Sequence, residues 1–172
     1  MFELQFPEDQ LPVWAEKYDY AAPDGLSRAP EKASRFMDEN GYLNKPLFVE
    51  LCRWKSPRPT RHYKKNSPSF IRKVTGEALS TSSERLRVEI LTLLEGVSWP
   101  TASVILHFGR EEAYPILDFR AFWSLGFDET PRYNFALWWK YVQFCCNLSQ
   151  KHGLTVRELD KALWKYSKDN QR

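Results

Sequence analysis

The sequence has few cysteines and no long apolar run. Its 172 residues include 3 cysteines, Cys52, Cys145 and Cys146, which are too few for a disulfide scaffold and are expected to be reduced thiols in a core. No stretch of eighteen apolar residues occurs, and the N-terminal sequence MFELQFPEDQ is acidic rather than basic. We therefore expect neither a membrane span nor a signal peptide, and a cytoplasmic protein without a membrane partner.

Metal-ligand spacing and strand patterning are also missing. His62, His107 and His152 show no spacing typical of a metal site, so we predict no metal and no cofactor. No segment alternates apolar and polar residues as a half-buried strand would. The sequence therefore predicts an all-α fold, with seven tryptophans contributing to an unusually aromatic core.

Two helices joined by a tight hairpin are predicted over residues 82–108. Thr81 and Glu84 have the spacing of a capping box at the start of the first helix. Four apolar residues of this helix recur at helical spacing and predict one buried face: Leu86, Ile90, Leu93 and Leu94.

The turn between these helices is a candidate phosphate site. Gly96 can take a positive φ and reverse the chain at little cost. Ser98 can cap the second helix, and Pro100 lies in its first turn, where a missing amide is tolerated. The second helix is apolar around most of its circumference, so we expect it to be buried. The hairpin would present consecutive backbone amides at a helix N-terminus, which suits a phosphate.

Positive charge is concentrated between residues 45 and 73. This segment has nine basic residues against one acid, Glu50, although the whole chain has a net charge of only +3. The basic residues are Lys45, Arg53, Lys55, Arg58, Arg61, Lys64, Lys65, Arg72 and Lys73. Such a segment is either a solvated surface or a basic face that binds nucleic acid, and its position before the hairpin favours the second interpretation.

One stretch of the chain resembles a known family. Its residues are Leu94-Glu95-Gly96-Val97-Ser98-x-x-Thr101-Ala102-x-x-x-Leu106, followed by Pro115-Ile116-Leu117-Asp118. This pattern resembles the hairpin and catalytic loop of the helix-hairpin-helix DNA glycosylases, the superfamily of endonuclease III and MutY-type enzymes. The family's hairpin reads Leu-Pro-Gly-Val-Gly, then Thr-Ala, an aliphatic run and a Val-Asp, and the spacing matches without a gap.

The resemblance implies a fold and a catalytic residue. It implies one two-lobed domain over residues 1–172, with a substrate cleft between two helical lobes. Lobe A would span about 44–117 and contain the helix-hairpin-helix at 82–108, and lobe B would combine about 1–43 with 119–172. Asp118 aligns with the family's catalytic aspartate and would lie at the junction of the lobes.

The departures from the family pattern narrow the expected chemistry. Ser98 replaces the second hairpin glycine. Pro100 falls where members that also cleave the strand carry a Schiff-base lysine, so we expect no lyase activity unless Lys64 or Lys65 supplies the amine. Many members bind a four-iron cluster through four spaced cysteines, which this chain does not have. The implied function is a monofunctional DNA N-glycosylase of base excision repair, acting on a damaged or mispaired base.

DNA binding is expected to be dominated by backbone contacts, without sequence specificity, on double-stranded and possibly damaged DNA. The candidate contacts are Gly96, Val97, Ser98, Thr101, Lys55, Arg58, Arg61, Lys64 and Lys65. Trp54, Tyr63 and Trp99 are candidate pocket or stacking aromatics, or simply core residues. We expect a monomer.

Two other functions are compatible with the same residues. Asp118 could be only a helix N-cap, and the chain would then be a catalytically inactive helix-hairpin-helix module that binds DNA on a glycosylase-like scaffold. Alternatively, the chain could be an all-α interaction protein whose aromatic C-terminal half docks another protein. Binding to DNA that weakens with salt would separate the first two functions from the third.

Overall fold

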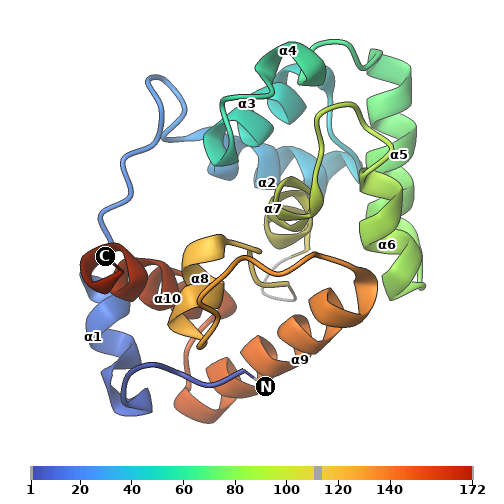
Figure 1. The fold of residues 1–172 in the computed structure, drawn as a ribbon. Coiled ribbons are helices and arrows are strands. Elements are labelled where there is room, and N and C mark those ends of the chain that lie inside the picture. The colour runs from blue at the N-terminus through green and yellow to red at the C-terminus, as the bar shows by residue number, and fades with distance from the viewer. Residues whose placement is uncertain (1, 111–113, 172) are drawn as a thin grey trace. The chain divides into compact units, whose positions relative to one another are not determined.

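The computed structural model describes residues 2–110 and 114–171. Every regular element assigned in these residues is a helix. The all-α class predicted from the sequence is therefore confirmed. The chain divides into two compact units. We call residues 21–110 the hairpin unit and residues 2–20 with 114–171 the terminal unit (Figure 1).

In the hairpin unit, α7 lies at the centre of the packing. It contacts α2, α3, α5 and α6 (Figure 1), and its residues 101–107 are all buried, as predicted from its apolar sequence. The helices of this unit are α2 (Ala29–Asn40), α3 (Lys45–Lys55), α4 (Thr60–Tyr63), α5 (Pro68–Ser80), α6 (Glu84–Leu91) and α7 (Trp99–Gly109).

The terminal unit is organised around α10, which contacts α1, α8 and α9. Residues 2–5 pack on this unit in extended form: the Gln5 amide donates to the Ser124 carbonyl at 3.0 Å, and the Phe2 ring lies against Phe122, with 5.7 Å between centroids. Its elements are η1 (Glu8–Gln10), α1 (Leu11–Glu16), α8 (Phe119–Ser124), α9 (Phe135–His152) and α10 (Val156–Asn170).

The predicted division of the chain differs from the structure in residues 21–43. The resemblance predicts that this segment packs with the C-terminal helices, whereas α2 packs on α3 and α7 and belongs to the hairpin unit. The apolar residues Ala33 and Met37 of α2 supply the buried side of this packing. The predicted cleft between two lobes remains a prediction.

Asn44, Ser67 and Thr155 each precede an apolar helical pattern in the sequence, which predicts them as N-caps, and the structure confirms all three. The Asn44 side chain accepts a hydrogen bond from the Leu47 amide at the start of α3. The Ser67 side chain accepts one from the Phe70 amide at the start of α5. Thr155 and Glu158 form the full capping box at the start of α10. Each of these side chains satisfies an amide that the first helical turn leaves without a backbone partner.

The first helix of the hairpin motif differs from its prediction. Ser83, not Thr81, is the N-cap of α6, because its side chain accepts from the Leu86 amide at 3.3 Å. The predicted buried face is only partly confirmed: Leu94 is 1% exposed, but Leu86 is 41% exposed and Leu93 is 62% exposed. The buried residues of α6 are Arg87, Val88 and Leu91, because this is the face that α6 turns toward α5 and α7.

Arg87 is buried because it caps another helix. Its guanidinium Nη1 donates to the Ala78 carbonyl at 2.8 Å, near the C-terminal end of α5, and Nη2 donates to the Thr81 carbonyl. A cation at this end of a helix is favoured by the helix dipole and by the unsatisfied carbonyls. Arg87 thus fixes α5 to the first helix of the hairpin motif.

No helix within residues 2–110 and 114–171 has the length and apolar character needed to cross a membrane.

Candidate nucleic-acid interface

The hairpin between α6 and α7 turns at Gly96, whose φ of +84° lies in the left-handed region. The Val97 amide donates to the Leu94 carbonyl at 3.0 Å and closes the turn, so this amide is occupied within the protein. In the part of the chain that the structure describes, the amides of Gly96 and Ser98 donate no hydrogen bond. These two amides, next to the N-terminus of α7, suit a phosphate oxygen.

Ser98 stands at the N-cap position of α7, in extended conformation, as predicted. Among the described residues, however, its side chain accepts no capping hydrogen bond, so the predicted side-chain cap is wrong. Pro100 lies in the first turn of α7, where its missing amide costs nothing. The hydroxyl of Ser98 is exposed and is a further group that could donate to an anion.

Gly96 is packed directly against α4. A Cβ atom added at Gly96 would lie 2.8 Å from Cδ1 of Tyr63, closer than real Cβ contacts come. The Tyr63 ring is fully buried, and its hydroxyl donates to the Ser56 carbonyl at 3.2 Å. Thr101, in the first turn of α7, is only 1% exposed. Thr101 therefore belongs to the interior of the hairpin unit and not to a surface that could meet DNA.

The three candidate aromatics, Trp54, Tyr63 and Trp99, differ in how deeply they are buried. Tyr63 is core, as described above, and Trp54 is 6% exposed, with its ring edge against Phe108 at 5.6 Å between centroids. Trp99, in the first turn of α7, is half-buried. Trp99 is thus the one of the three that reaches the surface beside the hairpin, whereas Trp54 packs on Phe108 of α7 and Tyr63 is buried against Gly96.

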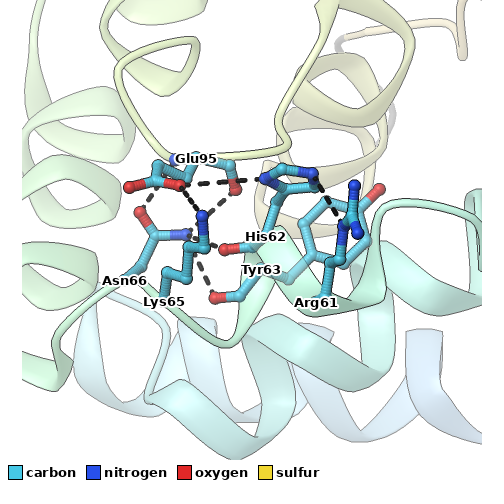
Figure 2. A network of polar contacts seen from close by, with 6 residues as sticks. All are labelled: Arg61, His62, Tyr63, Lys65, Asn66 and Glu95. Atoms are coloured by element: carbon cyan, nitrogen blue, oxygen red, sulfur yellow. Dashed lines mark hydrogen bonds and ion pairs between the residues drawn. The ribbon is translucent and has the colours of Figure 1, made fainter.

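Asn66 clamps the hairpin onto α4 (Figure 2). Its side-chain oxygen Oδ1 accepts from the Glu95 amide at 2.8 Å, and its Nδ2 donates to the Glu95 carbonyl at 3.0 Å and to the Tyr63 carbonyl at 3.1 Å. Asn66 is 5% exposed. Both backbone groups of the residue before Gly96 are therefore held by one buried amide side chain. Sequence analysis missed Asn66, because an asparagine before Ser67-Pro68 is typical of an ordinary loop.

Replacing Asn66 by alanine is expected to lower the free energy of unfolding of the hairpin unit by about 1–3 kcal/mol, since two buried backbone groups of Glu95 lose their partner. Urea unfolding measures this change. Asn40→Ala is the control, because the exposed Asn40 side chain donates to the Phe36 carbonyl at 2.9 Å within its own helix. Equal losses in the two variants would show that the clamp has no special role.

Exposed cations lie on α4 and the turn that follows it. Arg61, Lys64 and Lys65 are all exposed, and Arg58 is exposed in the loop before α4. Lys55, at the end of α3, is half-buried. Asn66 and Tyr63 join α4 and its following turn to the hairpin, so Arg61, Lys64 and Lys65 lie on the segment that the hairpin contacts.

Glu95 places a negative charge within this group of cations (Figure 2). Its carboxylate Oε2 lies 3.6 Å from Lys65 Nζ and 3.8 Å from His62 Nδ1, and Arg61 Nε donates to His62 Nε2 at 3.3 Å. Glu95 stands where the family hairpin has proline, and the sequence analysis gave it no role. Its carboxylate partly neutralises Lys65, so Arg61 and Lys64 are the stronger candidates for phosphate contact.

Asp118 belongs to the terminal unit, where it is the N-cap of α8. Its Oδ1 accepts from the Arg120 amide at 2.9 Å, and the residue is half-buried. The cap holds the carboxylate in a fixed direction. The Arg120 guanidinium lies over the Phe119 and Trp164 rings, 5.1 and 5.8 Å from their centroids.

The loop that leads to Asp118 is anchored from two helices. The Ile116 amide donates to both carboxylate oxygens of Asp160 on α10, at 3.2 and 3.1 Å. The Ile116 carbonyl accepts from the Tyr141 hydroxyl on α9 at 3.1 Å. Asp160 and Tyr141 are both buried. They position the backbone two residues before Asp118, and the sequence analysis missed both because each resembles an ordinary residue of an amphipathic helix.

The charge of Asp118 contributes to the raised pKa values of several tyrosines in the terminal unit. Burial, with the Asp118 charge as a second cause, raises the pKa of Tyr133 to about 12. Burial is also the main cause of the raised pKa of Tyr18 and of Tyr20, and the Asp118 charge adds to both shifts. Tyr18 and Tyr20 belong to an aromatic, proline-containing N-terminal stretch, to which the sequence assigns no function.

The described residues form no metal site, because no group of three His, Cys, Asp or Glu side chains among them could hold an ion.

No protein-family model, no curated protein and no solved structure matches the chain. The resemblance to helix-hairpin-helix glycosylases thus rests on the hairpin and on the position of Asp118.

Proposed function

We propose that this chain binds double-stranded DNA through the hairpin and the cations of α4, and that it acts as a monofunctional DNA N-glycosylase. The observation that carries DNA binding is the fixed hairpin: Gly96 and Ser98 present two amides without an internal acceptor in the described chain. Exposed Arg61 and Lys64 lie on the element to which the hairpin is clamped. Amides and cations together suit two neighbouring phosphates of one strand.

The chemical step is assigned to Asp118. Breaking an N-glycosidic bond builds positive charge on the deoxyribose, and a carboxylate close to the sugar can stabilise this charge or activate the attacking water. Asp118 is held by its cap to α8, and the loop before it is fixed by Asp160. Because Pro100 stands where a lysine would form a Schiff base, hydrolysis should leave an abasic site without strand cleavage.

A single-turnover assay tests this function. Duplexes carrying uracil, alkylated purines, 8-oxoguanine or mismatches are incubated with excess protein, and abasic sites are revealed by hot alkali. Excision of one of these bases, with strand breaks that require alkali, supports a monofunctional glycosylase. Strand breaks without alkali would assign the amine of a lysine to catalysis and contradict the proposal.

The exposed cations predict a salt-dependent affinity for DNA. Arg61→Ala and Lys64→Ala should each weaken binding to all duplexes alike and reduce the slope of log K against log salt by about 0.9 per lost phosphate contact. Fluorescence anisotropy at several salt concentrations measures the slope. Arg35→Ala, which removes an exposed cation of α2, is the control and should leave the slope unchanged. A similar decrease in all three variants would indicate only a loss of net charge.

A second candidate function is a DNA-binding module without catalysis. Tyr18 and Tyr20, which belong to the N-terminal segment, lie close enough to Asp118 for its charge to affect their pKa values. Aromatic rings at this position could occupy the space that a substrate base would need. In that case the protein binds DNA with the same salt dependence, and no duplex in the single-turnover assay is processed.

A further inference from the structure

A separate cavity of about 340 Å³ lies beside α9 in the terminal unit. Its lining residues are Tyr114, Trp139, Val142, Gln143, Cys146 and Asn147. Tyr114 and Val142 are buried and form its inner part, Trp139 and Cys146 are half-buried, and Gln143 and Asn147 are exposed at its rim. Trp139 and Cys146 lie in an apolar stripe of residues 133–151 that the sequence predicts as core, whereas the structure places both beside open space.

The aromatic walls of this cavity are held by further rings. Tyr114 is stacked on Trp138 with 5.7 Å between centroids and an interplanar angle of 17°. Trp139 is stacked on Phe135 with 6.4 Å between centroids and an angle of 10°. Rings supported in this way keep their orientation, so the cavity offers fixed aromatic surfaces against which a flat molecule can pack.

The polar groups of the cavity are uncharged. None of the six described lining residues is an aspartate, glutamate, lysine, arginine or histidine, and burial, with the charge of Asp160 as a second cause, raises the pKa of the Cys146 thiol. Gln143 and Asn147 are four residues apart, so their amides lie one turn apart on the same face of α9. Each amide can donate and accept a hydrogen bond. Among the described residues, this lining supplies no cation to balance a phosphate or a carboxylate, and it therefore favours an uncharged ligand.

We propose that this cavity binds an uncharged, planar heterocycle with ring N–H and C=O groups, of the chemical class of a free nucleobase. The ring would pack on Trp139 and Tyr114, and its polar edge would face the amides of Gln143 and Asn147. A volume at the small end of the range for ligand pockets suits a compound of one or two rings. The proposal does not depend on DNA binding or on Asp118.

Alkylation of Cys146 provides a readout at the site. Cys146 is half-buried, whereas Cys52 and Cys145 are completely buried and serve as internal controls in the folded protein. N-ethylmaleimide modification, located by tandem mass spectrometry, is followed with increasing adenine, hypoxanthine or uracil. At least one of them should slow Cys146 modification fivefold or more, saturating at a Kd below about 1 mM. Isothermal titration calorimetry measures the same Kd without the thiol.

Variants and control compounds decide the outcome. Trp139→Ala should abolish the protection of Cys146 by the heterocycle. Gln143→Ala combined with Asn147→Ala should weaken this protection about tenfold. Gln150→Ala, at an exposed position of α9 outside the lining, should have no effect on it. Asp118→Asn should bind the heterocycle as the wild type does, whatever the excision assay shows. The proposal is overturned if calorimetry detects no binding, or if benzoate or cyclohexanol protects Cys146 as well as the heterocycles do.

Discussion

Replacing Gly96 by alanine is expected to lower the free energy of unfolding of the hairpin unit by about 2–5 kcal/mol. Two effects contribute. The left-handed backbone, with φ of +84°, costs an L-residue roughly 1–2 kcal/mol, and a Cβ atom 2.8 Å from Tyr63 Cδ1 adds an overpacking cost of about 1–3 kcal/mol. Tyr63 cannot move away easily, because its ring is fully buried and its hydroxyl is bonded to the Ser56 carbonyl.

Gly41→Ala separates the two effects. Gly41 has a similar φ of +74°, at the end of α2 in the same unit, but no atom lies within 4 Å of a Cβ built there. This control should lose only the backbone part. Urea unfolding gives both values, and DNA affinity should fall in Gly96→Ala alone because the hairpin amides are displaced. Equal losses of stability in the two variants would contradict a close contact between the hairpin and α4.

The parts of the fold that depend on local chemistry could be predicted from the sequence. Asn44, Ser67 and Thr155 were identified as caps because an N-cap needs only one side-chain oxygen at a fixed position relative to its own helix. The turn at Gly96 was identified for a similar reason, since only glycine takes a positive φ at little cost. These features are determined within four residues, and the structure confirms them.

The parts that depend on tertiary contacts could not be predicted. Asn66 and Glu95 are 29 residues apart, and no local pattern indicates that one would hold the backbone of the other. The buried face of α6 was misassigned because apolar spacing does not reveal that Arg87, a charged residue, is buried to cap α5. Thr101 and Tyr63 were considered for ligand contact, but the close approach of the hairpin to α4 buries both.

Asp118→Asn is expected to reduce the single-turnover rate of base excision by about 10²–10⁴-fold, the usual contribution of one acid–base or charge-stabilising group. The substitution separates the two roles of this residue. Asparagine caps helices as well as aspartate does, so the hydrogen bond to the Arg120 amide should persist and the free energy of unfolding should change little. DNA affinity should stay the same, because the carboxylate is not a phosphate-binding group.

Two further measurements show whether the lost rate comes from the lost charge. Asp118→Ala removes the cap as well, and should cost about 1 kcal/mol more in unfolding free energy than Asp118→Asn. Burial and the Asp118 charge raise the pKa of Tyr133 to about 12. In Asp118→Asn this pKa should fall toward the value that burial alone sets, and an alkaline absorbance titration measures the change.

If the wild type and Asp118→Asn excise a base equally fast, Asp118 is only a helix cap and another residue carries out the chemistry. If neither protein excises any base but both bind DNA with equal salt dependence, the hairpin serves a binding module.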